Sequence, residues 1–397
     1  MGVIAYMFAV FARARKAALA VVAVGATMAL SACDTATVSS GGPSIDTSKP
    51  VPVALLVPRG SAQPGDAVLA QSLENAARMA IGDLKGAQID LRVYDTQGNA
   101  ATAASVAQKA VGDGARIILG PVYAESANAV GNAVAGQGVN VLSFSNNASI
   151  AGGNVFILGP TFDNTAERLA KFAARQGKRN VVTVYGNDVA GTAGRAAVDM
   201  AASRAGTRIV GSVPFEVSQQ GVVAAVPRIK DMVDSKGADA IFLTANTAGA
   251  LPLLTQLLPE AGVSPSAVQY IGLTRWDIPP QTLSLPGVQG GWFALPDPGK
   301  ASQFQARYSA AYGGAPHPIG GLAYDGIAAI GALVGSGRSD ALTGASLTQG
   351  AGFQGVGGIF RLLPNGTNQR GLAVASIQNR QVVVIDPAPA SFSGAGF

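Results

Sequence analysis

The sequence has 397 residues, of which 48% are hydrophobic and 13% charged, with one cysteine and one histidine. A chain of this length and composition can bury a large core, which suits one protein of two lobes rather than a disordered chain. The single cysteine excludes a disulfide within the chain, and a metal site built from several cysteines and histidines is excluded by number.

The net charge is +5, but part of it lies in a segment typical of targeting signals. Arg13, Arg15 and Lys16 precede the first acidic residue, Asp34. Removal of these three leaves 25 basic residues against 23 acidic ones, scattered rather than gathered in a stripe. A nearly neutral mature chain of this kind excludes the electrostatic footprint of a nucleic-acid-binding protein.

The N-terminus has the pattern of a secretory signal, with basic residues before the apolar run 17–30. The run is shorter than the roughly 20 residues that a membrane-spanning helix needs. The sequence Leu-Ser-Ala-Cys at 30–33 resembles the lipobox of bacterial lipoproteins, which predicts cleavage after residue 32 and a lipid on Cys33. The alternative is an ordinary signal peptide followed by a buried structural cysteine.

Residues 33–50 are rich in Ser, Thr, Gly and Pro without periodicity, which predicts a flexible tether between the lipid and the folded body. A tethered export product is expected in the bacterial cell envelope, facing the periplasm. By its resemblance to enterobacterial lipoproteins, Asp34 directly after Cys33 slightly favours the inner membrane.

The body begins with a regular alternation of β and α patterns. We expect strands at 51–57, 89–94, 116–119, 139–143 and 155–158, with helices at 67–84, 100–111 and 124–135 between them. A second series follows, with helices at 166–176, 190–205, 222–235 and 248–258 and strands at 180–185, 209–215, 238–244, 269–273 and 290–295. Asp163 or Asn164 can cap the first of these helices, and Pro227 marks either the start of the third or a kink.

Helices at 301–312 and 321–334 come next, and the tail changes to short antiparallel strands at 355–362, 371–378 and 381–385. Repeated βα units predict parallel sheets with right-handed crossovers. The predicted fold is therefore α/β with two Rossmann-like lobes.

Polar turns follow two adjacent strands of the first series. Gly120 and Pro121 close one strand, and Ser143, Ser145 and Asn146 follow the next. Parallel strands place both turns at the carboxyl edge of the sheet, where ligands bind in open α/β folds. The alternative is that these are ordinary βα turns, since Gly, Pro, Ser and Asn are common in any turn.

Several motifs, taken in order, resemble the type I periplasmic binding proteins of the leucine-binding family. They are ILGP at 118–121, VNVLSFSNN at 139–147, YGNDVAG at 185–191, LAYDGIAAI at 322–330 and FQGVGGIFRLLPNG at 353–366. The resemblance covers about 51–386 and implies a ligand bound between two lobes joined by a three-segment hinge. It implies one lobe from 51–160 and 296–336, another from 161–295 and 337–386, crossovers near 159–161, 295–298 and 334–339, and a C-terminal tail at 387–397.

The same resemblance implies ligand contacts at strand ends of both lobes. These are Ser143, Ser145, Asn146, Tyr185, Asn187, Asn246, Arg275 and Trp276. Where amino-acid binders of the family carry an acid for the ligand ammonium, this chain has Thr-Arg-Trp-Asp at 274–277, and Ala190 replaces a common aromatic residue. Arg275 could clamp a carboxylate or phosphate and Trp276 could stack on a ring. Alternatively, Arg275 pairs with Asp277 and Trp276 packs between the lobes.

Enzymatic function is not indicated, because the sequence contains no nucleophile elbow, no Ser-x-x-Lys, no P-loop and no dinucleotide fingerprint. His317 lies between two prolines, an unfavourable place for a catalytic base, and no cofactor is implied. We expect a receptor for a small polar ligand, an amino acid or related carboxylate, whose partner is an ABC permease. The alternative partner is a peptidoglycan synthase, because LSFSNN at 142–147, LTRWD at 273–277 and GGWFALPDP at 290–298 also resemble the penicillin-binding protein activator lipoproteins.

Overall fold

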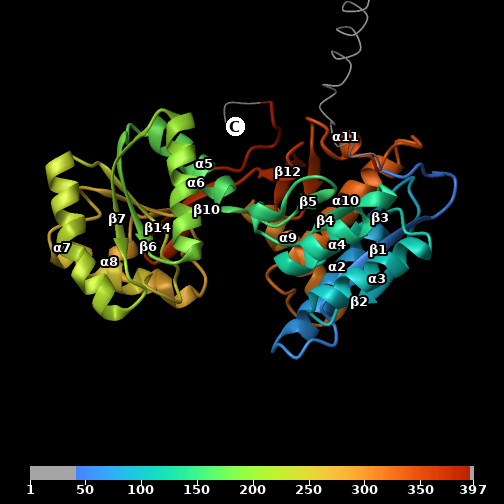
Figure 1. Ribbon diagram of the computed structural model, residues 1–397. Coiled ribbons are helices and arrows are strands. Elements are labelled where there is room, and N and C mark those ends of the chain that lie inside the picture. Colours follow the sequence, from blue (N-terminus) through green and yellow to red (C-terminus); the bar gives the residue numbers. More distant parts are fainter. Residues whose placement is uncertain (1–41, 394–397) are drawn as a thin grey trace, which may run out of the picture. The chain divides into compact units, whose positions relative to one another are not determined.

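The computed structural model describes residues 42–393, so the predicted signal segment, Cys33 and the start of the tether lie outside the described residues. Within the described residues, no helix is both long and apolar enough to cross a membrane. Two large sheets organise the body, and we call each sheet with the helices that pack on it a lobe (Figure 1).

The sheet of the first lobe has five parallel strands in the order β2-β1-β3-β4-β5. Their bounds are β1 Val51–Val57, β2 Ile89–Asp95, β3 Ile117–Leu119, β4 Asn140–Ser143 and β5 Val155–Ile157. Every residue of β3, β4 and β5 is buried, which explains their near-continuous apolar sequences. Because all five strands are parallel, their carboxyl ends share one edge.

Helices cover both faces of this sheet (Figure 1). On one face lie α2 (Asp66–Asp83), α9 (Pro298–Tyr312) and α10 (Gly321–Val334), and on the other α3 (Ala100–Gly112) and α4 (Ala124–Val134). Small residues let these helices approach closely. A Cβ added to Gly326 of α10, for example, would overlap the side chain of Leu119 on β3.

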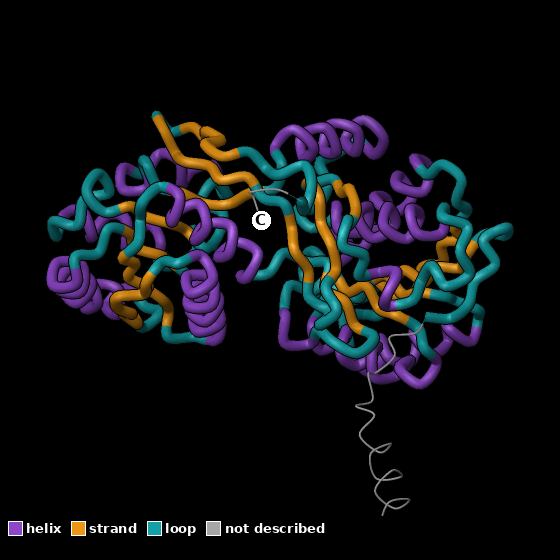
Figure 2. The backbone as a smooth tube through the Cα atoms, turned by 90° about the horizontal axis from the view of Figure 1, so that it is seen from above, coloured by secondary structure: helices purple, strands orange, loops and turns teal. Residues whose placement is uncertain are grey.

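The sheet of the second lobe has seven strands in the order β15-β14-β10-β9-β8-β6-β7. In both lobes helices flank the strands (Figure 2). Their bounds are β6 Asn180–Gly186, β7 Arg208–Phe215, β8 Ala240–Leu243, β9 Gln269–Gly272, β10 Trp292–Leu295, β14 Ala373–Gln378 and β15 Gln381–Asp386. The pairs of β10 with β14 and of β14 with β15 are antiparallel, and the other pairs are parallel. The parallel α/β fold predicted from the sequence is thus confirmed, with an antiparallel hairpin at one edge.

Four helices cover the second sheet, α5 (Phe162–Arg175) and α6 (Val189–Ala205) on one face and α7 (Gln219–Lys236) and α8 (Leu251–Glu260) on the other. The start of α5 is a capping box, in which the Thr161 hydroxyl accepts from the N–H of Asn164 and Oδ1 of Asn164 accepts from the N–H of Thr161. Helix α7 begins eight residues before Pro227 and continues beyond it, so this proline does not mark the helix start.

The stretch that the resemblance assigns to the second lobe, 337–386, is divided in the structure. It contains α11 (Gly344–Leu347) and a small antiparallel sheet, β11 Phe353–Gly355, β12 Gly358–Leu362 and β13 Asn368–Arg370, before β14. Leu342, Phe360 and Leu362 belong to the core of the first lobe. A short apolar strand is expected to be buried, but its sequence does not indicate which sheet it packs against. The sequence therefore did not show that the chain returns to the second lobe only near 370–372.

Hydrogen bonds from buried side chains tie the segments that connect the lobes. The Nδ2 of Asn368 donates to the carbonyls of Ile157 and Gly159, both at 2.8 Å, and its own carbonyl accepts from the Nδ2 of Asn164 at 2.8 Å. The N–H of Asp297, at the second connection, donates to the carbonyl of Gly357 at 2.8 Å. The first and third connections are therefore joined directly, and the second is joined to the turn between β11 and β12.

Candidate functional site

The turn after β4 brings the three predicted residues of the first lobe to its carboxyl edge. Ser143 is fully buried, and its hydroxyl donates to the carbonyl of Pro121 at 2.9 Å and accepts from the N–H of Ser145 at 3.1 Å. The Ser145 hydroxyl accepts from the N–H of Asn147 at 3.1 Å, whereas Asn146 is exposed. Ser143 therefore shapes the turn, Ser145 is 5% exposed, and Asn146 is exposed at the end of the turn.

A second polar group lies at the same edge, and the sequence pattern did not single it out. Asp66, the first residue of α2, is 5% exposed, and its Oδ1 accepts from the Tyr123 hydroxyl at 2.5 Å. Tyr123 is the residue before α4 and follows the turn after β3. Burial and the hydrogen bond to Asp66 raise the pKa of Tyr123 to about 12, so this hydroxyl remains a donor at neutral pH.

In the second lobe, three predicted residues lie at the carboxyl edge of the sheet, Tyr185 near the end of β6, Asn187 just after it and Asn246 after β8. Tyr185 is half-buried, with the Arg195 guanidinium 5.3 Å from the centre of its ring. Asn187 is exposed and its Nδ2 donates to Oε1 of Glu216 at 2.9 Å, and Asn246 is exposed in the turn after β8. These side chains present a phenol and two amides at this edge.

Arg275 and Trp276, which follow β9, have different environments. The Arg275 Nε donates to Oδ1 of Asp277 at 2.6 Å and its second nitrogen contacts Oδ2, a bidentate pair that neutralises the guanidinium. Trp276 is fully buried in the core of the second lobe, against Gly272 and Gly291. The ring therefore has no exposed face in this structure, and it lies inside one lobe rather than between two.

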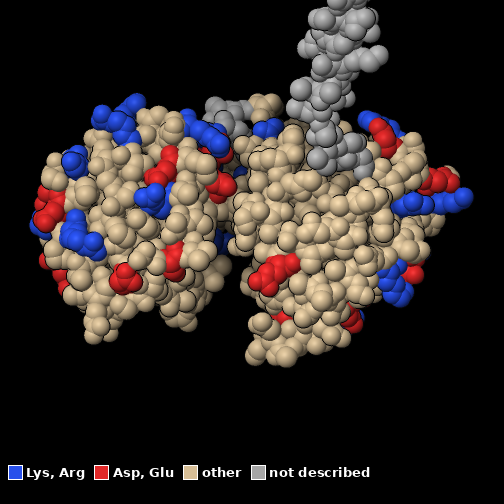
Figure 3. Space-filling model, viewed as in Figure 1, with Lys and Arg blue, Asp and Glu red and all other residues tan. Residues whose placement is uncertain are grey.

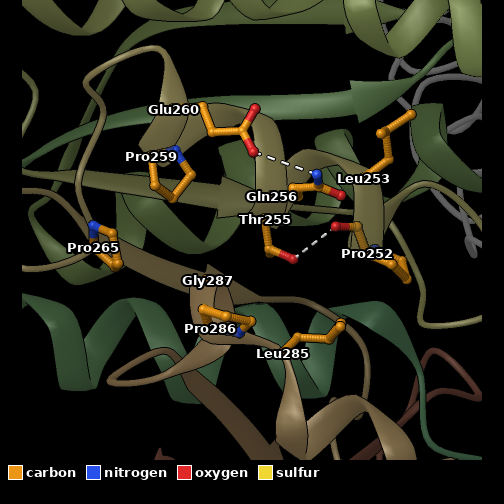
Figure 4. Close-up of a pocket in the computed structure, with 10 residues that line it drawn as sticks. All are labelled: Pro252, Leu253, Thr255, Gln256, Pro259, Glu260, Pro265, Leu285, Pro286 and Gly287. Carbon is orange, nitrogen blue, oxygen red and sulfur yellow. Dashed lines mark hydrogen bonds between the residues drawn. The ribbon is translucent and has the colours of Figure 1, made fainter.

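A cavity of about 710 Å³ lies elsewhere in the second lobe, beside α8 (Figure 4). Its lining is Pro252, Leu253, Thr255, Gln256, Pro259, Glu260, Pro265, Leu285, Pro286 and Gly287. The polar groups are already bonded, because the Thr255 hydroxyl donates to a carbonyl of its own helix at 2.9 Å and Gln256 donates to Glu260 at 3.3 Å. This apolar recess contains none of the residues predicted to bind the ligand.

In the part of the chain that the structure describes, no three His, Cys, Asp or Glu side chains are grouped as a metal site would require. On the face shown in Figure 3, basic and acidic side chains are interspersed, and that face carries no basic stripe. The polar edges of the two sheets are thus suited to a small ligand held by hydrogen bonds.

Comparison with known proteins identifies the family of the chain and supports its fold. A family model described as "Periplasmic binding protein" matches residues 50–381, which is most of the chain. No curated protein sequence matches significantly.

Three solved structures illustrate the similarity of fold. A putative branched-chain amino acid ABC transporter protein from Rhodospirillum rubrum has a TM-score of 0.72 at 20% identity, covering 85% of this chain and 100% of its own. An ABC transporter substrate-binding protein from Desulfitobacterium hafniense, in complex with Leu, has a TM-score of 0.61 at 18% identity. The match covers 85% of this chain and 100% of that protein. A solute-binding protein from Rhodopseudomonas palustris, in complex with 3,4-dihydroxybenzoic acid, has a TM-score of 0.57 at 18% identity. The match covers 86% of this chain and 98% of that protein.

Proposed function

Because the chain belongs to the periplasmic binding protein family, we propose that it is a non-catalytic receptor that delivers a small polar solute to an ABC permease. The observation that carries this proposal is the pair of polar carboxyl edges. Ser145 and Asn146 lie at one, and Tyr185, Asn187 and Asn246 lie at the other. Open α/β sheets bind ligands at these edges, and hydroxyl and amide groups are suited to a neutral or zwitterionic solute.

The solute class that we propose is an amino acid or a related carboxylate. The two ligands named for the similar structures, Leu and 3,4-dihydroxybenzoic acid, both carry a carboxylate. In this chain, the Ser145 hydroxyl and the Asn146 amide are the donors that would hold that group, because the N–H groups of Ser145 and Asn147 are bonded within the turn. Trp276 and Ser143 are left out of the contact set because both are fully buried, at 0% exposure, whereas Ser145 is 5% exposed. Arg275 is left at the rim of the site because Asp277 neutralises it.

Replacement of both Ser145 and Asn146 by alanine is expected to weaken binding by about 1–3 kcal/mol, since two donors to the ligand would be lost in a desolvated site. The ligand is first found by thermal shift with amino acids, small carboxylates, nucleosides and muropeptides, where a compound at 100 times its Kd stabilises by about 2.7 kcal/mol. Calorimetry then compares the double variant with Ser149→Ala, an exposed serine of the same turn. If the double variant bound the ligand as tightly as the natural protein does, neither residue would belong to the site.

We also propose that Cys33 carries a lipid that anchors the receptor to a membrane of the envelope. The support is the sequence Leu-Ser-Ala-Cys at 30–33 after a basic and apolar segment. The Cys33→Ala variant is expected to appear in the aqueous fraction of lysed cells, whereas the natural protein requires detergent. Retention of the variant with the membrane would show that another feature anchors it.

The partner that we propose is the permease rather than a peptidoglycan synthase. The proteins in the three comparisons above are described as transporter or solute-binding proteins, and none as a synthase regulator. Uptake of the radiolabelled solute by cells that lack this protein is expected to fall. Unchanged uptake of a solute that the purified protein binds would exclude delivery to a permease.

A further inference from the structure

The segment that follows β15 leads from the second lobe back to the first. We call residues 387–393 the tail strap. Ala388 packs against the core of the second lobe. Four residues later, Phe392 lies against Arg361 of β12, in the small sheet that packs on the first lobe. The tail strap therefore links the two lobes, in addition to the three connections.

The start of the tail strap is fastened by a buried arginine of the second lobe. Arg168 of α5 is 6% exposed, and its Nη2 donates to the carbonyl of Pro387 at 3.2 Å and pairs with the Asp386 carboxylate at 2.8 Å. The Nε of the same side chain donates to the carbonyl of Leu372, in the third connection, at 2.6 Å. One guanidinium thus holds both the third connection and the start of the tail strap.

The far end of the tail strap has a fixed seat on the small sheet. The Arg361 guanidinium lies 4.5 Å from the centre of the Phe392 ring. That guanidinium is held by Gln369, whose Oε1 accepts from its Nε at 2.9 Å and its Nη2 at 2.6 Å, and by the carbonyl of Gly350 at 3.1 Å. A Cβ added to Gly352 would lie only 2.7 Å from a carbon of the ring. The ring therefore contacts a positioned cation in space that a glycine leaves open.

The part between these two ends is short and stiff. Only residues 388–391 separate Pro387 from Phe392, and a fully extended chain of that length spans about 17 Å. Pro387 and Pro389 fix their own φ angles, and proline-rich segments act as semi-rigid spacers. A Cβ added to Gly371 would lie 3.2 Å from the carbonyl oxygen of Pro389, so the tail strap runs close beside the third connection. A segment of this kind has little slack with which to absorb a movement of the lobes.

Two lobes that are joined by connecting segments are expected to move relative to each other by hinge motion. We propose that the tail strap restrains this movement and holds the lobes in one arrangement until the Phe392 ring leaves Arg361. The Phe392 end is the one that releases, because its ring is half-buried, whereas Arg168 is buried and forms an ion pair. This inference concerns the protein without ligand, so its failure and the failure of the proposed function are independent.

The test measures the distance between two nitroxide labels, one on each lobe, by pulsed electron paramagnetic resonance. Gln108→Cys on α3 and Ser235→Cys on α7 supply exposed attachment points, and Cys33→Ala removes the only other thiol of the chain. The labelled protein without ligand is expected to give one main distance. Phe392→Ala is expected to raise the share of molecules outside that distance about 2- to 5-fold, the factor that corresponds to a cation–π contact of about 0.5–1 kcal/mol.

Arg361→Gln removes the cation that the ring contacts and is expected to have the same effect on the distance distribution. The double variant Arg361→Gln with Phe392→Ala should add little to either single change, because both changes remove the same contact. The matched control is Val383→Ala, which alters an exposed side chain of β15 and is expected to leave the distribution as it is in the natural protein.

Circular dichroism first establishes that each variant is folded. A folded Phe392→Ala with the distance distribution of the natural protein would overturn the inference. An equal change in Val383→Ala would overturn it too, since the effect would then not belong to the seat of the ring. Independent effects of the two changes in the double variant would show that the ring and the guanidinium do not act together, which contradicts the proposed seat. If Phe392→Ala fails to fold, Arg361→Gln decides the matter by the same criterion.

Discussion

We expect replacement of Trp276 by alanine to lower the free energy of unfolding by about 3–5 kcal/mol, as large-to-small changes of buried aromatic residues do. The indole is fully buried in the core of the second lobe, and a Cβ added to Gly272 or Gly291 would overlap it. The two glycines thus form a slot that no other side chain of the native core fills. Urea unfolding monitored by circular dichroism measures the change.

The matched control is Arg275→Ala, which alters the neighbouring, partly exposed residue and is expected to change stability little. Trp276→Phe should lower the free energy of unfolding by less than Trp276→Ala does. The indole Nε1 is buried without a hydrogen-bond partner, so its loss removes packing but no hydrogen bond. If Trp276→Ala kept full stability but lost the ligand, the stacking role predicted from the sequence would replace the structural one.

The sequence predicted most of the fold because its signals are local. Runs of β-branched residues such as Ile117–Leu119 end at glycine or proline, and helix starts are marked by caps such as Asn99, whose side chain accepts from the N–H of Thr102 at 3.0 Å. Each of these signals depends on neighbours within a few residues. The element boundaries found in the structure consequently lie within a few residues of those expected.

The candidate site was harder to predict because the sequence of a turn does not show which of its side chains are buried. Trp276 and Arg275 are adjacent, yet the first turns into the core and the second pairs with Asp277. Periodicity does not apply to a turn, so it could not separate them. Asp66 was missed for a similar reason. A helix commonly begins with an acid, and the hydrogen bond to this one comes from Tyr123, 57 residues later.

A second large effect is expected at the buried ion pair of Asp325 on α10 and Arg370 on β13. The Arg370 guanidinium lies 3.1 Å from Oδ2 of Asp325, and the two side chains are only 10% and 2% exposed. The N–H of Val356 donates to Oδ1 at 2.8 Å, and Arg370 also donates to the carbonyl of Leu158. The pair thus ties α10 to two of the segments that connect the lobes.

Asp325→Ala is expected to cost about 3–5 kcal/mol in urea unfolding, because it leaves the Arg370 charge buried without a partner. The control is Asp340→Ala, which breaks the ion pair between Asp340 and Arg338. Both of these side chains are more than half exposed, so this change should alter stability little. The double variant Asp325→Leu with Arg370→Met removes both charges and should recover most of the lost stability. A double variant as unstable as Asp325→Ala would mean that the hydrogen bonds to Val356 and Leu158, rather than charge compensation, hold these segments to α10. Recovery of stability with altered ligand affinity would instead show that the pair is kept for the geometry of the connections and not for stability.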